Sequence, residues 1–157
     1  MPGDDVSMPT LMSAAQRTYL VAIQEALAGA GFGDVPPTGY RIVGALTRGG
    51  SSVQELATRL AMSKQAVGRL ADVLVQRGYV TRTSDAADRR RVILLLTERG
   101  GAATEEARQA IATVDQLVAG RVESHELATT RATLRALVSI GRGLRPGLGG
   151  GRGGDAS

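Results

Sequence analysis

The sequence contains no cysteine, no tryptophan and a single histidine, His125, among its 157 residues. Without cysteine, the chain has no disulfide, no thiolate metal site and no thiol redox sensor. One histidine gives no basis for a histidine-rich metal site or for a catalytic set of nucleophile, histidine and acid. No glycine-rich phosphate loop follows an expected strand. We therefore expect no enzyme activity, no metal and no cofactor.

Aromatic residues and long apolar runs are also scarce. Because only Phe32, Tyr19, Tyr40 and Tyr79 are aromatic, the core must be built from aliphatic side chains, which suits helix packing. No apolar run approaches the roughly 20 residues that a transmembrane helix needs. The first ten residues show no basic start followed by an apolar stretch, so we expect no signal peptide and a cytoplasmic protein.

Positive charge is concentrated in one segment. Residues 51–100 contain nine Lys or Arg against five Asp or Glu, and this difference accounts for the whole net charge of +4. A basic excess confined to one segment is typical of a surface that binds nucleic acid. Charge alone is equally compatible with a solvated basic face on an ordinary domain.

The spacing of apolar residues predicts a mainly helical chain with one β-hairpin, an α+β fold class. The expected helices are 11–30, 38–48, 51–60, 63–77, 97–118 and a last one capped by Ser124, and the expected strands are 80–83 and 92–96. Eight of the fourteen residues from Gly141 to Gly154 are glycine. We therefore expect a disordered tail over 145–157, and a flexible N-terminus over 1–10.

The two short helices within 51–77 have the pattern of a helix-turn-helix. Ala57 falls where the helices would cross, Met62 fills the space under the turn, and Ser63 is placed to cap the second helix. This arrangement leaves the start of the second helix protruding, with a shape suited to the major groove. Lys and Arg reach guanine O6 and N7, and Gln bonds adenine. The candidate DNA contacts are therefore Ser63, Lys64, Gln65 and Arg69.

Gly68 interrupts the same helix. In mid-helix a glycine costs about 0.5–1 kcal/mol relative to alanine. It therefore indicates either a close approach of another backbone or a tolerated weakness.

A polar loop between the two strands carries three consecutive arginines, Arg89, Arg90 and Arg91. Like charges so close together need acids or phosphates nearby, and Asp85 and Asp88 are placed to brace one or two of them. The others, together with Arg82, are candidates for the DNA backbone or the minor groove. The alternative is a solvated turn with local ion pairs that contribute little.

Together these residues resemble the MarR family of transcriptional regulators. The stretch from Asp85 to Gly100 is similar to the family's wing signature, an acid, then acid-Arg-Arg, an apolar strand and Leu-Thr-Glu-x-Gly. The stretch from Glu55 to Val80 is similar to the family's helix-turn-helix core. The resemblance identifies residues 51–100 as a winged helix-turn-helix.

The resemblance implies a homodimer that binds a palindromic operator and represses transcription in response to a ligand. It places the winged helix-turn-helix in a domain of residues 11–144, flanked by dimerisation helices over 11–32 and 101–144. The apolar stripes of these helices need burial, and the candidate dimer contacts are Leu20, Ile23, Leu27, Leu127, Leu134, Leu137 and Val138.

The resemblance also implies a pocket for a small aromatic or phenolic effector between the dimer helices and the helix-turn-helix. Tyr19 and Tyr40 are candidates to line it, although both also suit plain core packing. The alternative function is a winged helix that binds protein or RNA. Lys64, Gln65 and Arg69 favour double-stranded DNA, since all three can read bases.

Overall fold

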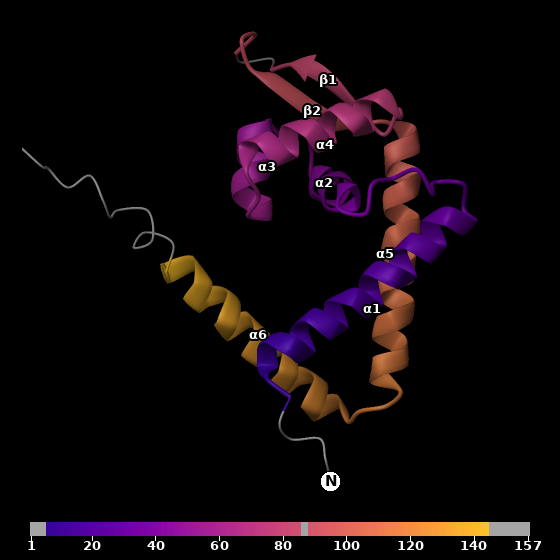
Figure 1. The fold of residues 1–157 in the computed structure, drawn as a ribbon, viewed down its shortest axis with the longest axis vertical. Coiled ribbons are helices and arrows are strands. Elements are labelled where there is room, and N and C mark those ends of the chain that lie inside the picture. Colours follow the sequence, from indigo (N-terminus) through magenta and orange to yellow (C-terminus); the bar gives the residue numbers. More distant parts are fainter. Residues whose placement is uncertain (1–5, 86–87, 145–157) are drawn as a thin grey trace, which may run out of the picture. The chain divides into compact units, whose positions relative to one another are not determined.

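The computed structural model describes residues 6–85 and 88–144. This part of the chain forms two compact units, one up to Val114 and one from Asp115. The mainly α fold with one β-hairpin is confirmed. The elements are α1 (Met8–Gly29), α2 (Gly39–Leu46), α3 (Val53–Leu60), α4 (Lys64–Gln76), β1 (Val80–Ser84), β2 (Val92–Leu96), α5 (Glu98–Ala119) and α6 (Ser124–Leu144), as Figure 1 shows.

The helices α3 and α4 form the predicted helix-turn-helix. The Ser63 hydroxyl accepts the Ala66 N–H at 3.1 Å, so Ser63 caps α4 as predicted. Helix α3 ends at Ala61, which adopts a left-handed conformation with φ of 57° and turns the chain toward α4. Ala57 is buried at the contact between the helices, and Met62 packs against the core beneath the turn.

The core of the first unit is aliphatic around one buried aromatic ring. Leu56, Val67 and Leu74 are fully buried, and Leu94 of β2 joins them. Tyr79 is also fully buried, and its ring meets Phe32 edge to face at 6.3 Å between centroids. The sequence correctly indicated a core that rests on aliphatic side chains.

The hairpin lies beside α4, and its tip points away from the helices (Figure 1). Strands β1 and β2 pair antiparallel, with Val80 opposite Leu96 and Ser84 opposite Val92. Ser51 adds a single antiparallel bridge to Leu94, which joins the start of the helix-turn-helix to the sheet. The hairpin and the loop at its tip are called the wing below.

Two predicted dimer contacts lie inside the first unit. Ile23 and Leu27 are 2% and 4% exposed and belong to the core that α2, α3 and α4 share. Their apolar side chains are therefore buried within the chain itself, which leaves them little surface for a dimer interface. Leu20 is half-buried on the same helix.

Helix α6, described by itself, presents an apolar surface. Leu134, Leu137 and Val138 are 36%, 39% and 57% exposed, while Leu127 is half-buried. Ser124 is the first residue of α6 and not its cap, because the Glu123 carbonyl accepts the first helical N–H groups and the Glu126 carboxylate accepts the Glu123 N–H. The predicted tail over 145–157 lies outside the described residues.

Candidate nucleic-acid interface

The first turns of α4 present the residues that the sequence assigned to base reading. Lys64, Gln65 and Arg69 are all exposed, whereas Val67 and Leu74 on the opposite side of the helix are buried. The Ser63 hydroxyl is engaged in the cap, so it has less freedom to contact DNA than its neighbours. The structure thus brings two cations and one amide together on one protruding face.

Gly68 lies on this helix with open space around it. A Cβ built on Gly68 would find no atom within 4 Å outside its own helix backbone and its chain neighbours. A close approach of another backbone within this chain is therefore not the reason for the glycine.

The loop of the wing is closed by the two acids that the sequence singled out. The Arg90 N–H donates to the Asp88 carboxylate at 3.0 Å, and the Arg91 N–H donates to the Asp88 carbonyl at 2.8 Å. The Asp85 N–H donates to the Arg91 carbonyl at 2.8 Å. The Asp85 carboxylate lies 3.6 Å from the Arg91 guanidinium. Asp88 braces the turn through the backbone, and Asp85 braces it through an ion pair.

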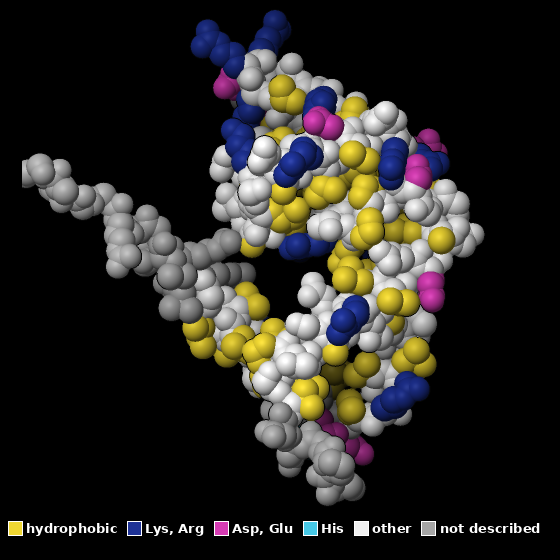
Figure 2. Space-filling view, viewed as in Figure 1, with side chains coloured by type: hydrophobic (Ala, Val, Ile, Leu, Met, Phe, Trp, Pro, Cys, Tyr) yellow, Lys and Arg dark blue, Asp and Glu magenta, His cyan; other side chains and the backbone are white. Residues whose placement is uncertain are grey.

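Ion pairs divide the basic residues of the interface into two groups. Arg82 pairs with Asp72 of α4, and Arg91 pairs with both Glu55 of α3 and Asp85. Within the described residues, the other four make no ion pair: Lys64, Arg69, Arg89 and Arg90. Figure 2 shows Lys and Arg side chains projecting at the tip of the wing. These unpaired cations are the groups available to phosphate or base edges.

Sequence reasoning missed the ion pair that joins Glu55 of α3 to Arg91 of the wing. Hydrogen bonds from Ser52 and the ion pair with Arg91 lower the pKa of the Glu55 carboxyl to about 2, and the same pair raises the pKa of Arg91. Because the pKa of folded Glu55 lies below its ordinary value, the carboxylate keeps its charge until the pH falls toward 2. The local signal was the capping-box pattern Ser52-x-x-Glu55, which marks a helix start and says nothing of Arg91.

A second cluster, also missed, joins the loop before α2 to the start of α5. The Tyr79 hydroxyl donates to the Asp34 carboxylate, and Arg99 bonds both Asp34 at 3.1 Å and the Tyr79 oxygen at 2.9 Å. The Arg99 guanidinium also lies over the Phe32 and Tyr79 rings. The bond from Tyr79 is the main cause that lowers the pKa of Asp34, while burial raises the pKa of Tyr79.

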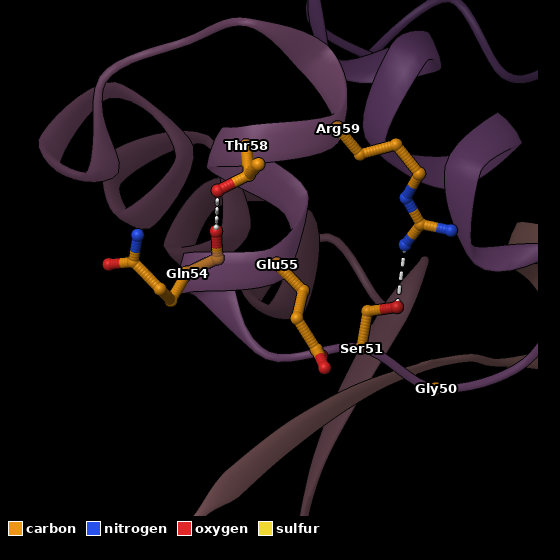
Figure 3. A pocket seen from close by; sticks show the side chains of 6 residues that line it. All are labelled: Gly50, Ser51, Gln54, Glu55, Thr58 and Arg59. Carbon is orange, nitrogen blue, oxygen red and sulfur yellow. Dashed lines mark hydrogen bonds between the residues drawn. The ribbon is translucent and has the colours of Figure 1, made fainter. Parts of the chain in front are cut away.

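In the first unit, cavities lie along α3, between α3 and the wing, and between α2 and α5. One of about 480 Å³ borders α3, where Arg59 donates to the Ser51 hydroxyl at 2.6 Å and the Glu55 carboxylate is directed away from Arg59 (Figure 3). One of about 400 Å³ lies between α3 and the wing and includes Glu55 and Arg91.

The third cavity, of about 450 Å³, lies between α2 and α5. Tyr40 lines it, together with Arg41, Thr104 and Ile111, whereas Tyr19 of α1 is half-buried and is not among its lining residues. The structure therefore separates the two tyrosines that the sequence analysis grouped.

Metal and membrane sites were also sought in the described residues. Across 6–85 and 88–144, no group of three or more His, Asp or Glu is arranged to hold a metal ion. No helix in this part of the chain is both long and apolar enough to cross a membrane.

Comparison with known proteins supports the resemblance seen in the sequence. Residues 34–91 match the model of the MarR family. A search of curated proteins found no match. The matched segment runs from Asp34 through Arg91, so it contains the helix-turn-helix and most of the wing.

Solved structures of MarR-type proteins share the fold. A MarR transcriptional regulator from Methanosarcina mazei Go1 is 19% identical, with a TM-score of 0.74 over 87% of this chain and 97% of that chain. A mutant MarR from E. coli complexed with operator DNA is 22% identical, with a TM-score of 0.70 over 83% and 92%. CouR from Rhodococcus jostii RHA1 bound to p-coumaroyl-CoA is 24% identical, with a TM-score of 0.67 over 85% and 92%. The predicted likeness to MarR-type winged-helix regulators is confirmed.

Proposed function

We propose that this chain, a MarR-type winged helix-turn-helix protein, regulates transcription as a homodimer that binds a palindromic operator in double-stranded DNA. One observation carries the proposal. The start of α4 and the tip of the wing together present four exposed cations, Lys64, Arg69, Arg89 and Arg90, none of which forms an ion pair with an acid of the described residues. We assign the chain no catalytic role.

The exposed side chains of α4 and those of the wing suit different parts of a duplex. Lys64, Gln65 and Arg69 lie on a helix start shaped for the major groove, where Lys and Arg can bond guanine and Gln can bond adenine. Arg89 and Arg90, at the tip of the wing, suit phosphates or an adjacent minor groove. A protein-binding or RNA-binding winged helix would not need base-reading side chains at these positions.

The surface of α6 supports a homodimer. Leu134, Leu137 and Val138 expose apolar area on one helix, and apolar surface of this kind marks interaction sites. In Figure 2, hydrophobic side chains are visible along α6. A symmetric dimer presents two copies of α4, and this symmetry matches a palindromic operator.

Selection from a random pool of DNA duplexes, followed by footprinting, tests the proposal. We expect the protein to enrich an inverted repeat whose half-sites lie one helical turn, about 10–10.5 base pairs, or a multiple of it apart. Enrichment of no sequence, or preferential retention of single-stranded RNA over duplex DNA, would contradict it.

We further propose that the protein is a repressor released by a small aromatic effector in the cavity between α2 and α5. The cavity offers the Tyr40 ring and hydroxyl together with apolar surface, a combination suited to a planar ligand. CouR, which shares the fold, is bound to p-coumaroyl-CoA in its structure.

Tyr40→Leu tests this assignment. We expect the variant to keep wild-type operator affinity and to need a higher concentration of a phenolic acid for release, because the substitution removes the stacking face and the hydroxyl. The measurement is fluorescence anisotropy of labelled operator during titration with the acid. Tyr19→Leu is the matched control, since Tyr19 does not line the cavity. Normal release of Tyr40→Leu would leave Tyr40 as a packing residue.

A further inference from the structure

We propose that Arg91 is a positioning residue of the wing, held by Glu55 of α3, and does not itself contact DNA. The inference rests on the proposed DNA binding and refines it. It divides the three consecutive arginines of the wing into one that fixes the wing against the helix-turn-helix and two that face the duplex.

Arg91 is fixed through both its side chain and its backbone. One terminal nitrogen of its guanidinium pairs with Glu55, and the other lies 3.6 Å from the Asp85 carboxylate. Its backbone carbonyl and N–H are both engaged, with the Asp85 N–H and the Asp88 carbonyl, each at 2.8 Å. A phosphate would have to compete with two carboxylates for this guanidinium.

Glu55 is also held in place by contacts that do not involve Arg91. One carboxylate oxygen accepts the Ser52 N–H at 2.9 Å and the Ser52 hydroxyl at 3.1 Å, while the other oxygen pairs with Arg91. The carboxylate also lies at the N-terminus of α3, where the helix dipole favours negative charge. The acceptor is therefore preorganised, and the position of the wing is coupled to the start of the helix-turn-helix.

Arg82 of β1 makes a parallel connection to the second helix through its pair with Asp72 of α4. The wing is thus tied to both helices, to α3 through Arg91, which immediately precedes β2, and to α4 through Arg82 of β1. Arg89 and Arg90 have no such acid among the described residues, although they adjoin Arg91 in sequence. The side chains of Arg91 and Glu55 are 41% and 51% exposed, so we expect the effect of their pairing on geometry to exceed its effect on folding stability.

Glu55→Gln separates positioning from DNA contact. The amide still accepts the Ser52 N–H and keeps the cap, but it loses the charge that holds Arg91. Removing a negative charge beside DNA would by itself strengthen binding. We instead expect Glu55→Gln and Arg91→Ala each to weaken operator affinity, between about twofold and thirtyfold, as is common for residues that act through others. We expect the double variant to be no weaker than the weaker single variant.

The salt dependence of operator affinity gives the second measurement. Replacing an arginine that binds a phosphate reduces the slope of log affinity against log salt by about one. We expect Arg91→Ala to leave this slope unchanged. A reduced slope, additive losses in the double variant, or unchanged or stronger binding by Glu55→Gln would each overturn the inference.

Glu126→Gln is the matched control. Its carboxylate accepts the Glu123 N–H at 2.9 Å at the start of α6, the same capping bond that Glu55 makes on α3, but it has no partner in the described part of the wing. We expect wild-type operator affinity from this variant. If the wild-type protein binds operator and random duplex equally, the proposed function fails. If it prefers operator and only the Glu55 and Arg91 results differ from expectation, the positioning role alone fails.

Discussion

Gly68 and Gly100 lie in the same winged helix-turn-helix but differ in the space around them. A Cβ on Gly100 would fall 2.0 Å from the Tyr79 carbonyl oxygen, so the start of α5 approaches the backbone too closely for any side chain. A Cβ on Gly68 would meet nothing within 4 Å. Gly100 is therefore required by packing, whereas nothing in the described part of the chain requires Gly68.

Two alanine substitutions test this difference. Gly68→Ala should raise the free energy of unfolding by about 0.5–1 kcal/mol, because alanine favours the helix interior. Gly100→Ala should lower it by about 1–3 kcal/mol, because the backbone must shift to admit the methyl group. Urea unfolding followed by circular dichroism measures both. A destabilised Gly68→Ala variant would show that the open space around Gly68 is filled in solution.

Residue roles that depend on local sequence could be predicted, and roles that depend on distant partners could not. The Ser63 cap joins residues three apart, so the sequence showed it; the sequence also singled out Asp88, but expected it to brace an arginine side chain, whereas it accepts backbone N–H groups two and three residues on. The pair of Glu55 with Arg91 and that of Asp34 with Arg99 join residues brought together only by the fold. Charge patterning along the chain cannot identify such partners.

At the scale of elements, we propose that the wing and α4 make two kinds of contact with DNA. We expect Arg89→Ala and Arg90→Ala to weaken binding to operator and to random duplex equally. Each of these substitutions should reduce the salt slope by about one if the arginine binds a phosphate. Gln65→Ala should cost about 1–3 kcal/mol on operator and relax the preference at one position of each half-site. Titrations on operator and random duplex at several salt concentrations measure these effects.

Two results would contradict the assignment of Gln65 to a base and of Arg89 to the DNA backbone. Equal losses on operator and random duplex for Gln65→Ala would place Gln65 on the backbone. A loss confined to operator for Arg89→Ala would place Arg89 on a base edge.

Most element boundaries could be predicted because helix starts carry local signals. The start of helix α1 differs most from its prediction, since α1 begins at Met8 and not at Leu11. The prediction followed the apolar period, whereas Pro9 in the first turn already marks the start. The apolar stripe of α1 was also found correctly, but a stripe does not show whether it packs within its own chain. The sequence therefore could not show that Ile23 and Leu27 pack into the core of their own chain.

At the scale of the whole molecule, the proposed function makes DNA binding by this chain depend on a second copy. We expect Leu134→Asp to abolish the dimer, because a charge buried in an apolar interface without a partner is costly. Operator binding should fall with it, since one half-site alone gives only part of the contacts. Light scattering measures the mass, and a gel shift measures binding.

Ala132→Asp is the control for the added charge. Ala132 is exposed on α6 and lies two residues from Leu134, so its side chain points to a different side of the helix. We expect it to remain dimeric. A Leu134→Asp variant that stays dimeric would show that α6 does not carry the interface.

The central claim is that the chain reads DNA sequence, and one ratio tests it most directly. Dissociation constants are measured for the selected operator and for a scrambled duplex of the same length and composition, at the same salt concentration. We expect the operator to bind at least about 10³-fold more tightly, the lower end of the range for specific DNA-binding proteins. A ratio near one would contradict the account, because the unpaired cations of α4 and the wing would then bind phosphates alone.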